Sequence, residues 1–235
     1  MHITWLGQAG FRLQSNSGVT IYIDPYLSDS LFEKNGESHR RQTPIDDRFL
    51  RESIDVLILT HAHGDHTDMG TLDRLFSVNK NIPVLAPRHI LSLLRERYQD
   101  SEDWMLFEPG TEITIRGIRF AAAFAMHSDP CPIGVIIELD DRTIAHTGDT
   151  MYHRQLLSDY PKNLDLLLLP VNGKGNNMNA FDAARLTAAL KPRAVFPMHW
   201  DMFLSYSCDP KSYTDLIHDL GTEIIQSDPY EEITL

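Results

Sequence analysis

The sequence predicts an α/β protein of four layers, in which two mixed β-sheets pack face to face and helices cover their outer faces. Three observations support this fold class. Short apolar strands fill residues 3–23, strands return between residues 104 and 146, and helical segments follow both strand-rich regions. This pattern favours two packed sheets over one doubly wound sheet. Because no linker rich in Gly, Ser or Pro divides the 235 residues, we expect a single domain spanning residues 1–235.

The N-terminal part of the chain combines strands with one long polar segment. Short apolar runs between turn residues predict strands at 3–6, 11–14 and 19–23. Residues 26–51 are polar and without periodicity, and loops of this length in compact domains are often functional. We therefore expect residues 26–51 to form a loop excursion at the active site.

The next part alternates strands and helices. A buried strand at 55–59 precedes a helix at 69–78, which Thr67 or Asp68 would cap. A strand at 83–86 then precedes a helix at 88–98.

Strands dominate again before a final alternating region. We predict strands at 112–116, 118–123, 134–139 and 143–146. The last third alternates strand and helix, at 165–169, 180–190, 194–197, 210–220 and 223–226.

A histidine-rich segment, THAHGDH at residues 60–66, directly follows the apolar run 56–59. Its three imidazoles and one carboxylate belong to His61, His63, Asp65 and His66. Imidazole and carboxylate are common ligands of Zn, Mn and Fe ions. Gathering so many titratable groups costs desolvation and repulsion unless a cation offsets it. The segment therefore indicates a metal site at a strand end.

Three further candidate ligands follow predicted strands later in the chain. His127 comes after the apolar run 120–126, Asp149 follows a glycine turn, and His199 lies just beyond the run 195–198. Each has an ordinary interpretation when taken alone, such as a solvated histidine or a helix cap. Their common placement at strand ends favours a shared site.

These motifs resemble those of metallo-β-lactamase-fold hydrolases, whose HxHxDH signature matches residues 61–66. The resemblance implies a four-layer αββα sandwich with two metal ions. It implies that His61, His63 and His127 hold one ion, that Asp65, His66 and His199 hold the other, and that Asp149 bridges them. We also expect Asp24, in the segment Ile23-Asp24-Pro25, and His146 to lie just outside the ligands.

The resemblance implies that such a site catalyses hydrolysis. Two divalent cations held ~3.5–4 Å apart can bridge a hydroxide, lower its pKa towards neutrality and polarise a carbonyl or phosphoryl oxygen. Asp65 is the candidate catalytic residue, which would orient the hydroxide or relay a proton. The ligand set fits Zn or Mn, with Fe as an alternative.

Finer motifs lie in the segments 24–30, 171–179 and 197–203. They resemble the L-ascorbate-6-phosphate lactonase branch, and this resemblance implies a lactone or related ester of a small phosphorylated or carboxylated sugar acid as the substrate. Arginines bind phosphate or carboxylate through two hydrogen bonds. We therefore predict substrate contacts from Arg40, Arg41, Lys174 and Asn177.

Other functions stay open. A phosphodiesterase or nuclease on the same fold is the main alternative, and a diiron redox protein is a third. The net charge of −12 argues against nucleic-acid and anionic-membrane partners. The sequence has only two cysteines, and it shows neither a signal peptide nor an apolar run long enough to span a membrane, which predicts a cytoplasmic protein. A homo-oligomer stays open as well.

Overall fold

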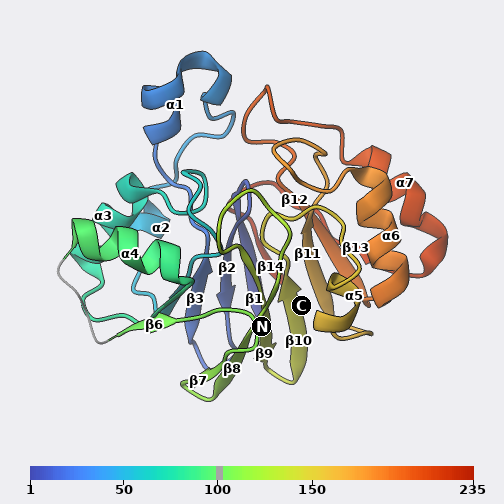
Figure 1. Ribbon diagram of the computed structural model, residues 1–235, viewed down its shortest axis with the longest axis horizontal. Helices are drawn as coiled ribbons and strands as arrows, with labels where there is room; N and C mark the ends of the chain where they lie inside the picture. Colours follow the sequence, from blue (N-terminus) through green and yellow to red (C-terminus); the bar gives the residue numbers. More distant parts are fainter. Residues whose placement is uncertain (99–102) are drawn as a thin grey trace.

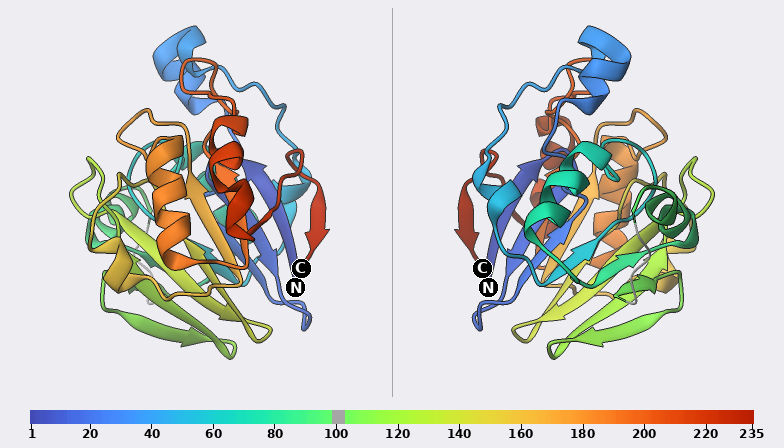
Figure 2. Two further views of the ribbon diagram at one scale, coloured as in Figure 1. Left: turned by 90° about the vertical axis from the view of Figure 1, so that its right-hand side faces the viewer. Right: turned by 90° about the vertical axis from the view of Figure 1, so that its left-hand side faces the viewer.

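The computed structural model describes residues 1–98 and 103–235, and it contains the predicted four layers (Figure 1). Within these residues the strands form two seven-stranded sheets. Helices lie against the outer face of each sheet, as the two side views in Figure 2 show. The predicted fold class is therefore confirmed.

The first sheet has the strand order β14-β1-β2-β3-β4-β5-β6. Its first half is antiparallel, and β3, β4, β5 and β6 run parallel to one another. The strands are β1 (His2–Gly7), β2 (Gly10–Gln14), β3 (Thr20–Ile23), β4 (Val56–Ile58), β5 (Val84–Ala86), β6 (Trp104–Leu106) and β14 (Glu232–Thr234). Of these, β6 and β14 were not predicted, because three-residue edge strands leave almost no alternating pattern.

The second sheet repeats the same plan, with the order β13-β12-β11-β10-β9-β8-β7. Here β10 to β13 are parallel and β7 to β10 are antiparallel. The strands are β7 (Glu112–Ile115), β8 (Ile118–Phe124), β9 (Ile133–Leu139), β10 (Arg142–His146), β11 (Leu166–Pro170), β12 (Ala194–Met198) and β13 (Glu223–Ile224). All five residues of β11 and of β12 are buried, as expected of central parallel strands covered on both faces.

The helices divide between the two outer faces. Apolar side chains of α2 (Arg48–Arg51), α3 (Met69–Val78) and α4 (Arg88–Arg97) pack on the first sheet. Those of α5 (Leu156–Asp159), α6 (Ala180–Leu190) and α7 (Lys211–Ile217) pack on the second, and the short 3₁₀ turn η2 (His218–Leu220) extends α7. The helix predicted at 69–78 has these same bounds, and Asp68 rather than Thr67 caps it. The four-residue α5 was not predicted.

The main core lies between the sheets. It joins buried residues of both, among them Trp5, Phe11, Phe120 and Phe196, and the ring of Phe11 meets that of Phe196 edge to face with centroids 5.1 Å apart. This shared core fixes the two sheets against each other, so that side chains from both can meet at one edge. No helix among the described residues has the length and apolar character to cross a bilayer.

The long segment 26–51 is not structureless. It contains α1 (Ser30–Asn35), the 3₁₀ turn η1 (Gly36–His39) and the short helix α2. Neither α1 nor η1 has a fully buried residue, and α1 stands apart from the layers at the top of Figure 1. The sequence hid these elements because a helix without a buried face shows no apolar periodicity.

Candidate metal centre

The predicted ligands meet at one edge of the molecule, beyond the carboxyl ends of strands. The His-rich segment follows β4, and His127 follows β8. Asp149 follows β10, and His199 directly follows β12. Because β4 belongs to the first sheet and the other three strands to the second, both sheets contribute to the site.

A tight turn arranges the ligands of the His-rich segment. The backbone N–H groups of His66 and Thr67 both donate to the carbonyl of His63, at 3.0 and 2.8 Å. The Thr67 hydroxyl, which the sequence offered as a helix cap, donates instead to the carbonyl of His61. The turn then enters α3, where Asp68 accepts from the N–H groups of Gly70 and Thr71. The capped helix thus anchors the segment that carries four candidate ligands.

The first cluster consists of His61, His63 and His127. Nδ1 of His63 lies 3.1 Å from Nε2 of His61 and 3.1 Å from Nε2 of His127. One nitrogen from each ring lies within 4.8 Å of the other two. His127 turns its other ring nitrogen, Nδ1, to the carbonyl of Asn176 at 3.1 Å, which leaves Nε2 to face the cluster.

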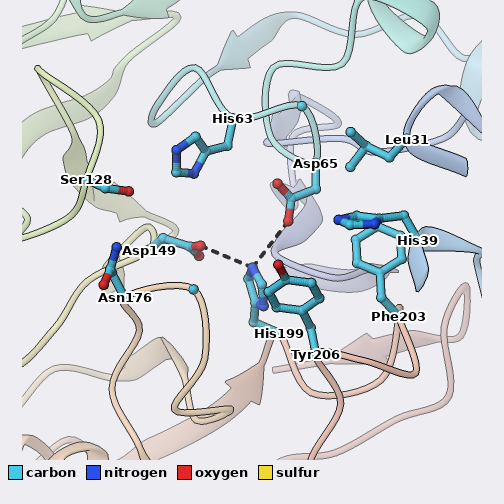
Figure 3. A pocket seen from close by; sticks show the side chains of 12 residues that line it. Leu31, His39, His63, Asp65, Ser128, Asp149, Asn176, His199, Phe203 and Tyr206 are labelled. Carbon is cyan, nitrogen blue, oxygen red and sulfur yellow. Dashed lines mark ion pairs between the residues drawn. The ribbon is translucent and has the colours of Figure 1, made fainter. Parts of the chain in front are cut away.

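The second cluster consists of Asp65, His66 and His199. Asp149 lies beside Asp65 and His199, as Figure 3 shows. Nε2 of His199 lies 3.4 Å from Asp65 Oδ2 and 3.1 Å from Asp149 Oδ2. Asp149 Oδ1 lies 3.4 Å from Nε2 of His66, and its Oδ2 lies 3.8 Å from Nε2 of His127. Asp149 therefore lies between the two clusters, where a bridging ligand is expected.

Two unpartnered polar atoms indicate that the site fits cations. Nε2 of His66 and Oδ1 of Asp149 are buried and lack a hydrogen-bond partner among the described residues. Leaving such atoms unsatisfied costs ~1–3 kcal/mol each. A cation between them would satisfy both atoms, and histidine nitrogen with carboxylate oxygen is the donor set that Zn, Mn and Fe accept.

The electrostatics of the cluster favour added positive charge. Burial alone would raise the pKa of Asp149, but His199 and His66 outweigh it and hold that pKa well below its usual range. Burial likewise opposes the charging of His199, yet Asp149 and Asp65 raise the pKa of His199 to about 9. The carboxylates thus stay ionised and hold protons on nearby imidazoles. A divalent cation could replace those protons.

A second group of polar residues orients the candidate ligands. Asp24 accepts from His66 Nδ1 at 2.7 Å and from the backbone N–H of Thr60 at 2.8 Å, so His66 presents Nε2 to the site. Gln8 donates to Asp65 Oδ2 at 2.6 Å. A partner for each ligand is a common property of metal sites. The sequence pointed to Asp24 but not to Gln8, since a lone glutamine in a turn carries no motif of its own.

His146, also expected near the ligands, occupies a fully buried position behind them. The backbone N–H of Gly148 donates to Nδ1 of His146 at 3.0 Å, which leaves Nε2 to donate to the carbonyl of Ala9 at 2.9 Å. These bonds tie the glycine turn before Asp149 to the first sheet. His146 therefore positions Asp149 through the backbone.

Three residues of the site adopt a left-handed backbone. Gln8, Asp24 and His199 have φ angles of 55°, 43° and 65°. This conformation is unfavourable for residues with a Cβ atom and is found mainly where the surrounding structure enforces it. All three follow strand ends and turn their side chains into the site.

A cavity of about 270 Å³ opens over the candidate ligands. His63, Asp65, Asp149 and His199 lie at its floor (Figure 3). Ser128 and Asn176 form one side, and Leu31, His39, Phe203 and Tyr206 form the other. The segment 26–51, predicted to lie at the active site, thus contributes Leu31 and His39.

The predicted substrate contacts do not gather in this cavity. Arg41 is buried, and its guanidinium donates to the carbonyls of Tyr26 and Thr43 and to the hydroxyl of Tyr230. Arg40 is exposed and forms a two-hydrogen-bond pair with Glu37.

The other two predicted contacts have protein partners as well. Lys174 donates to the carbonyls of Ser205 and Ser207 at 3.0 and 3.1 Å, away from the cavity. Asn177 is buried and donates to Asp149 Oδ2 at 3.0 Å, so it supports a candidate ligand. Their contact with a substrate stays a prediction that the geometry does not favour, because runs of residues in sequence do not reveal which way side chains turn.

Comparison with known proteins agrees with this geometry. Residues 19–200 match the family model of the β-lactamase superfamily domain. A UPF0173 metal-dependent hydrolase of Pyrococcus horikoshii is 30% identical over 99% of this chain and 99% of its own. Among solved structures, the metallo hydrolase Igni18 of Ignicoccus hospitalis superposes with a TM-score of 0.76 at 23% identity, covering 99% of this chain and 97% of Igni18. The diiron β-hydroxylase CmlA of Streptomyces venezuelae gives 0.74 at 15% identity, covering all of this chain but 54% of CmlA.

Proposed function

Because the chain belongs to the β-lactamase superfamily and to its UPF0173 metal-dependent hydrolases, we propose that it hydrolyses a lactone or a related ester at a centre of two divalent metal ions. The observation that carries this proposal is the convergence of seven histidine and aspartate side chains, from both sheets, under one cavity. Membership of this family establishes metal-dependent hydrolysis. Our proposal adds the number of metal ions and the kind of bond that is cleaved.

We assign the ligands by their positions. His61, His63 and His127 would hold one ion, and Asp65, His66 and His199 the other, with Asp149 between them. When bound, such ions lower the pKa of water and polarise a carbonyl oxygen. The full ligand set supports two ions, and Zn or Mn, or alternatively Fe, matches its chemistry.

Asp65 is the proposed proton carrier. It lines the cavity, and Gln8 holds its Oδ2 by a hydrogen bond of 2.6 Å. Burial opposes its ionisation, but the neighbouring His66 and His199 outweigh burial and hold the pKa of Asp65 below its usual range. An ionised carboxylate in this place can accept a proton from water and return it to the leaving group.

We retain ester hydrolysis as the proposed reaction. We do not retain the anionic sugar acid that the lactonase resemblance implies as its substrate. A lactone needs only a polarised carbonyl and water, which this centre can supply. A phosphorylated tail needs cations, and Arg40, Arg41 and Lys174 are engaged elsewhere. A phosphodiesterase or nuclease is the second choice, because the net charge of −12 argues against a nucleic-acid substrate. The likeness to CmlA concerns the fold alone.

The test joins metal content to activity. We expect His66→Ala to abolish hydrolysis and to lower bound metal, because it removes a buried ligand that Asp24 orients. Metal analysis of the purified protein would accompany assays on lactones, phosphodiesters and thioesters with added Mn or Zn. His218→Ala changes an exposed histidine far along the chain and is the matched control.

Two results would contradict the proposal. Full activity of His66→Ala with unchanged metal content would show that the assignment of the ligands is wrong. Turnover of phosphodiesters alone, with no ester or lactone cleaved, would replace the ester chemistry with the second choice.

A further inference from the structure

We infer that the substrate carries a neutral, apolar group, which binds against the wall formed by Leu31, His39, Phe203 and Tyr206. This wall is called the apolar wall below. The inference rests on the proposed ester hydrolysis and names the class of ester. It departs from the anionic substrate that the sequence predicts.

The residues that line the cavity favour an apolar group over an anionic one. Among the described residues that line it, none is an arginine or a lysine. Its charged groups are those of the candidate ligands, and Ser128 and Asn176 lie on one side (Figure 3). The opposite side joins the apolar side chains of Leu31 and Phe203 to the rings of His39 and Tyr206, which add one imidazole and one hydroxyl group. An anionic tail placed there would lose its hydration without gaining an arginine or lysine partner, which is unfavourable. An apolar group there would be removed from water at no such cost.

The apolar wall consists of two segments that are distant in the sequence, and hydrogen bonds hold them together. The N–H of Gln42 donates to the carbonyl of Met202 at 2.9 Å, and the Ser205 hydroxyl donates to the carbonyl of Ser38 at 2.6 Å. The ring of His39 lies 5.4 Å from that of Phe203 and 5.5 Å from that of Tyr206. The wall is therefore preorganised, which reduces the entropy lost on binding.

Helix α1 places Leu31 over the candidate metal centre. A Cβ atom at Gly64, between His63 and Asp65, would lie 2.8 Å from Cδ2 of Leu31. The leucine thus packs directly on the His-rich segment. Leu31 is partly buried and also packs against a small apolar cluster formed by Tyr26, Met202 and Phe203. It therefore extends this cluster to the wall of the cavity.

The size of the cavity limits the group. Pockets for drug-sized ligands measure about 300–1,000 Å³, and this one measures about 270 Å³. It suits an acyl chain of a few carbons or one ring beside the scissile bond. We accordingly expect small neutral esters or lactones as substrates.

Binding and turnover both test the inference. Aliphatic hydroxamates chelate active-site metals, so pentanoyl hydroxamate and succinyl monohydroxamate compare an apolar tail with a carboxylate tail. Calorimetric titration of the metal-loaded protein should show tighter binding of the pentanoyl compound. The same comparison uses 4-nitrophenyl butyrate and mono-4-nitrophenyl succinate as substrates, where kcat/KM should favour the butyrate.

Variants of the wall identify its contribution. Leu31→Ala and Tyr206→Ala should each weaken pentanoyl hydroxamate by roughly tenfold, as expected for losing most of one buried apolar contact, and should leave the succinyl compound nearly unchanged. Leu204→Ala is the matched control, because Leu204 is adjacent to Phe203, is 72% exposed and does not line the cavity. Bound metal should be equal in all variants.

The outcomes separate the two proposals. If the protein binds the carboxylate tail as tightly as the apolar one, or if both tails weaken equally in the wall variants, the apolar class is wrong while ester hydrolysis stands. If no ester or lactone is hydrolysed, ester hydrolysis is wrong, and the hydroxamate titration still decides the character of the wall.

Discussion

At the scale of single residues, the candidate centre depends on side chains whose protonation the protein controls. Carboxylates beside it are paired with imidazoles, and their pKa values fall below the usual range. Asp201, two residues beyond His199, is different. Burial raises the pKa of Asp201 to about 6, and its Oδ1 is buried without a hydrogen-bond partner among the described residues. Folding therefore shifts the equilibrium of Asp201 towards its protonated form.

This raised pKa predicts a gain of stability for Asp201→Asn. The usual pKa of 3.8 rises to about 6 on folding, so stability is lost as the pH increases through this interval. Asparagine is uncharged like the protonated acid, so the variant does not lose this stability as the pH increases. We expect the free energy of unfolding at pH 7.5 to increase by about 1–3 kcal/mol, as measured by urea denaturation of the metal-free protein.

The pH dependence supplies the control. The gain should shrink below pH 4, where Asp201 is protonated in both states, and Asp219→Asn, at a side chain 89% exposed, should change nothing. An equal gain at pH 4 and pH 7.5 would show that burial of the charge is not its cause.

At the scale of elements, α3 connects the candidate centre to the cavity wall. Its cap Asp68 accepts from the N–H groups of Gly70 and Thr71 and from the hydroxyl of Ser30 at the start of α1. One buried carboxylate thus ends the His-rich segment, starts α3 and holds α1. The sequence placed the cap at Thr67 or Asp68, but the bond to Ser30 joins residues 38 positions apart and leaves no local pattern.

We expect Asp68→Ala to lower the free energy of unfolding by about 1–2 kcal/mol through loss of the cap, as measured by urea denaturation. Asp73→Ala on the same helix breaks the partly exposed pair with Arg97 and a hydrogen bond from the Tyr98 hydroxyl, and it should cost less than about 1 kcal/mol. Equal costs for the two variants would refute the role of the cap.

At the scale of the whole molecule, the site exists only because the two sheets are packed together. The first sheet supplies the His-rich segment, and the second supplies His127, Asp149 and His199. A metal ion that binds ligands from both sheets stabilises the folded state over the unfolded one.

Loading with Zn or Mn should therefore raise the melting temperature, and a chelator should lower it. At free metal 100 to 1,000 times the dissociation constant, the stabilisation is about 3–4 kcal/mol. Since the pKa of His199 is about 9 in the metal-free protein, protons compete with metal below that pH. The metal-induced increase should grow from pH 6 to pH 9. A melting temperature independent of metal, in scanning calorimetry of protein whose metal content does change, would contradict this.

The sequence predicts the layers, and the candidate ligands that it indicates lie together in the structure, for physical reasons. Ligands beyond strand ends meet at one sheet edge whatever the details of the loops, and strongly apolar strands such as β11 are recognisable locally. The walls of the cavity depend instead on directions of side chains. Arg41 and Lys174 looked like anion contacts in the sequence, yet backbone carbonyls take up their donors. Only tertiary structure reveals such partners.

The left-handed conformation of Gln8, Asp24 and His199 has a consequence for the stability of the folded chain. Glycine adopts this conformation without the cost that a Cβ atom brings. The folded chain therefore bears a conformational cost at three positions, and the side chains at these positions form the candidate centre or contact its ligands. The geometry of the centre and the stability of the fold thus make opposite demands on the same backbone.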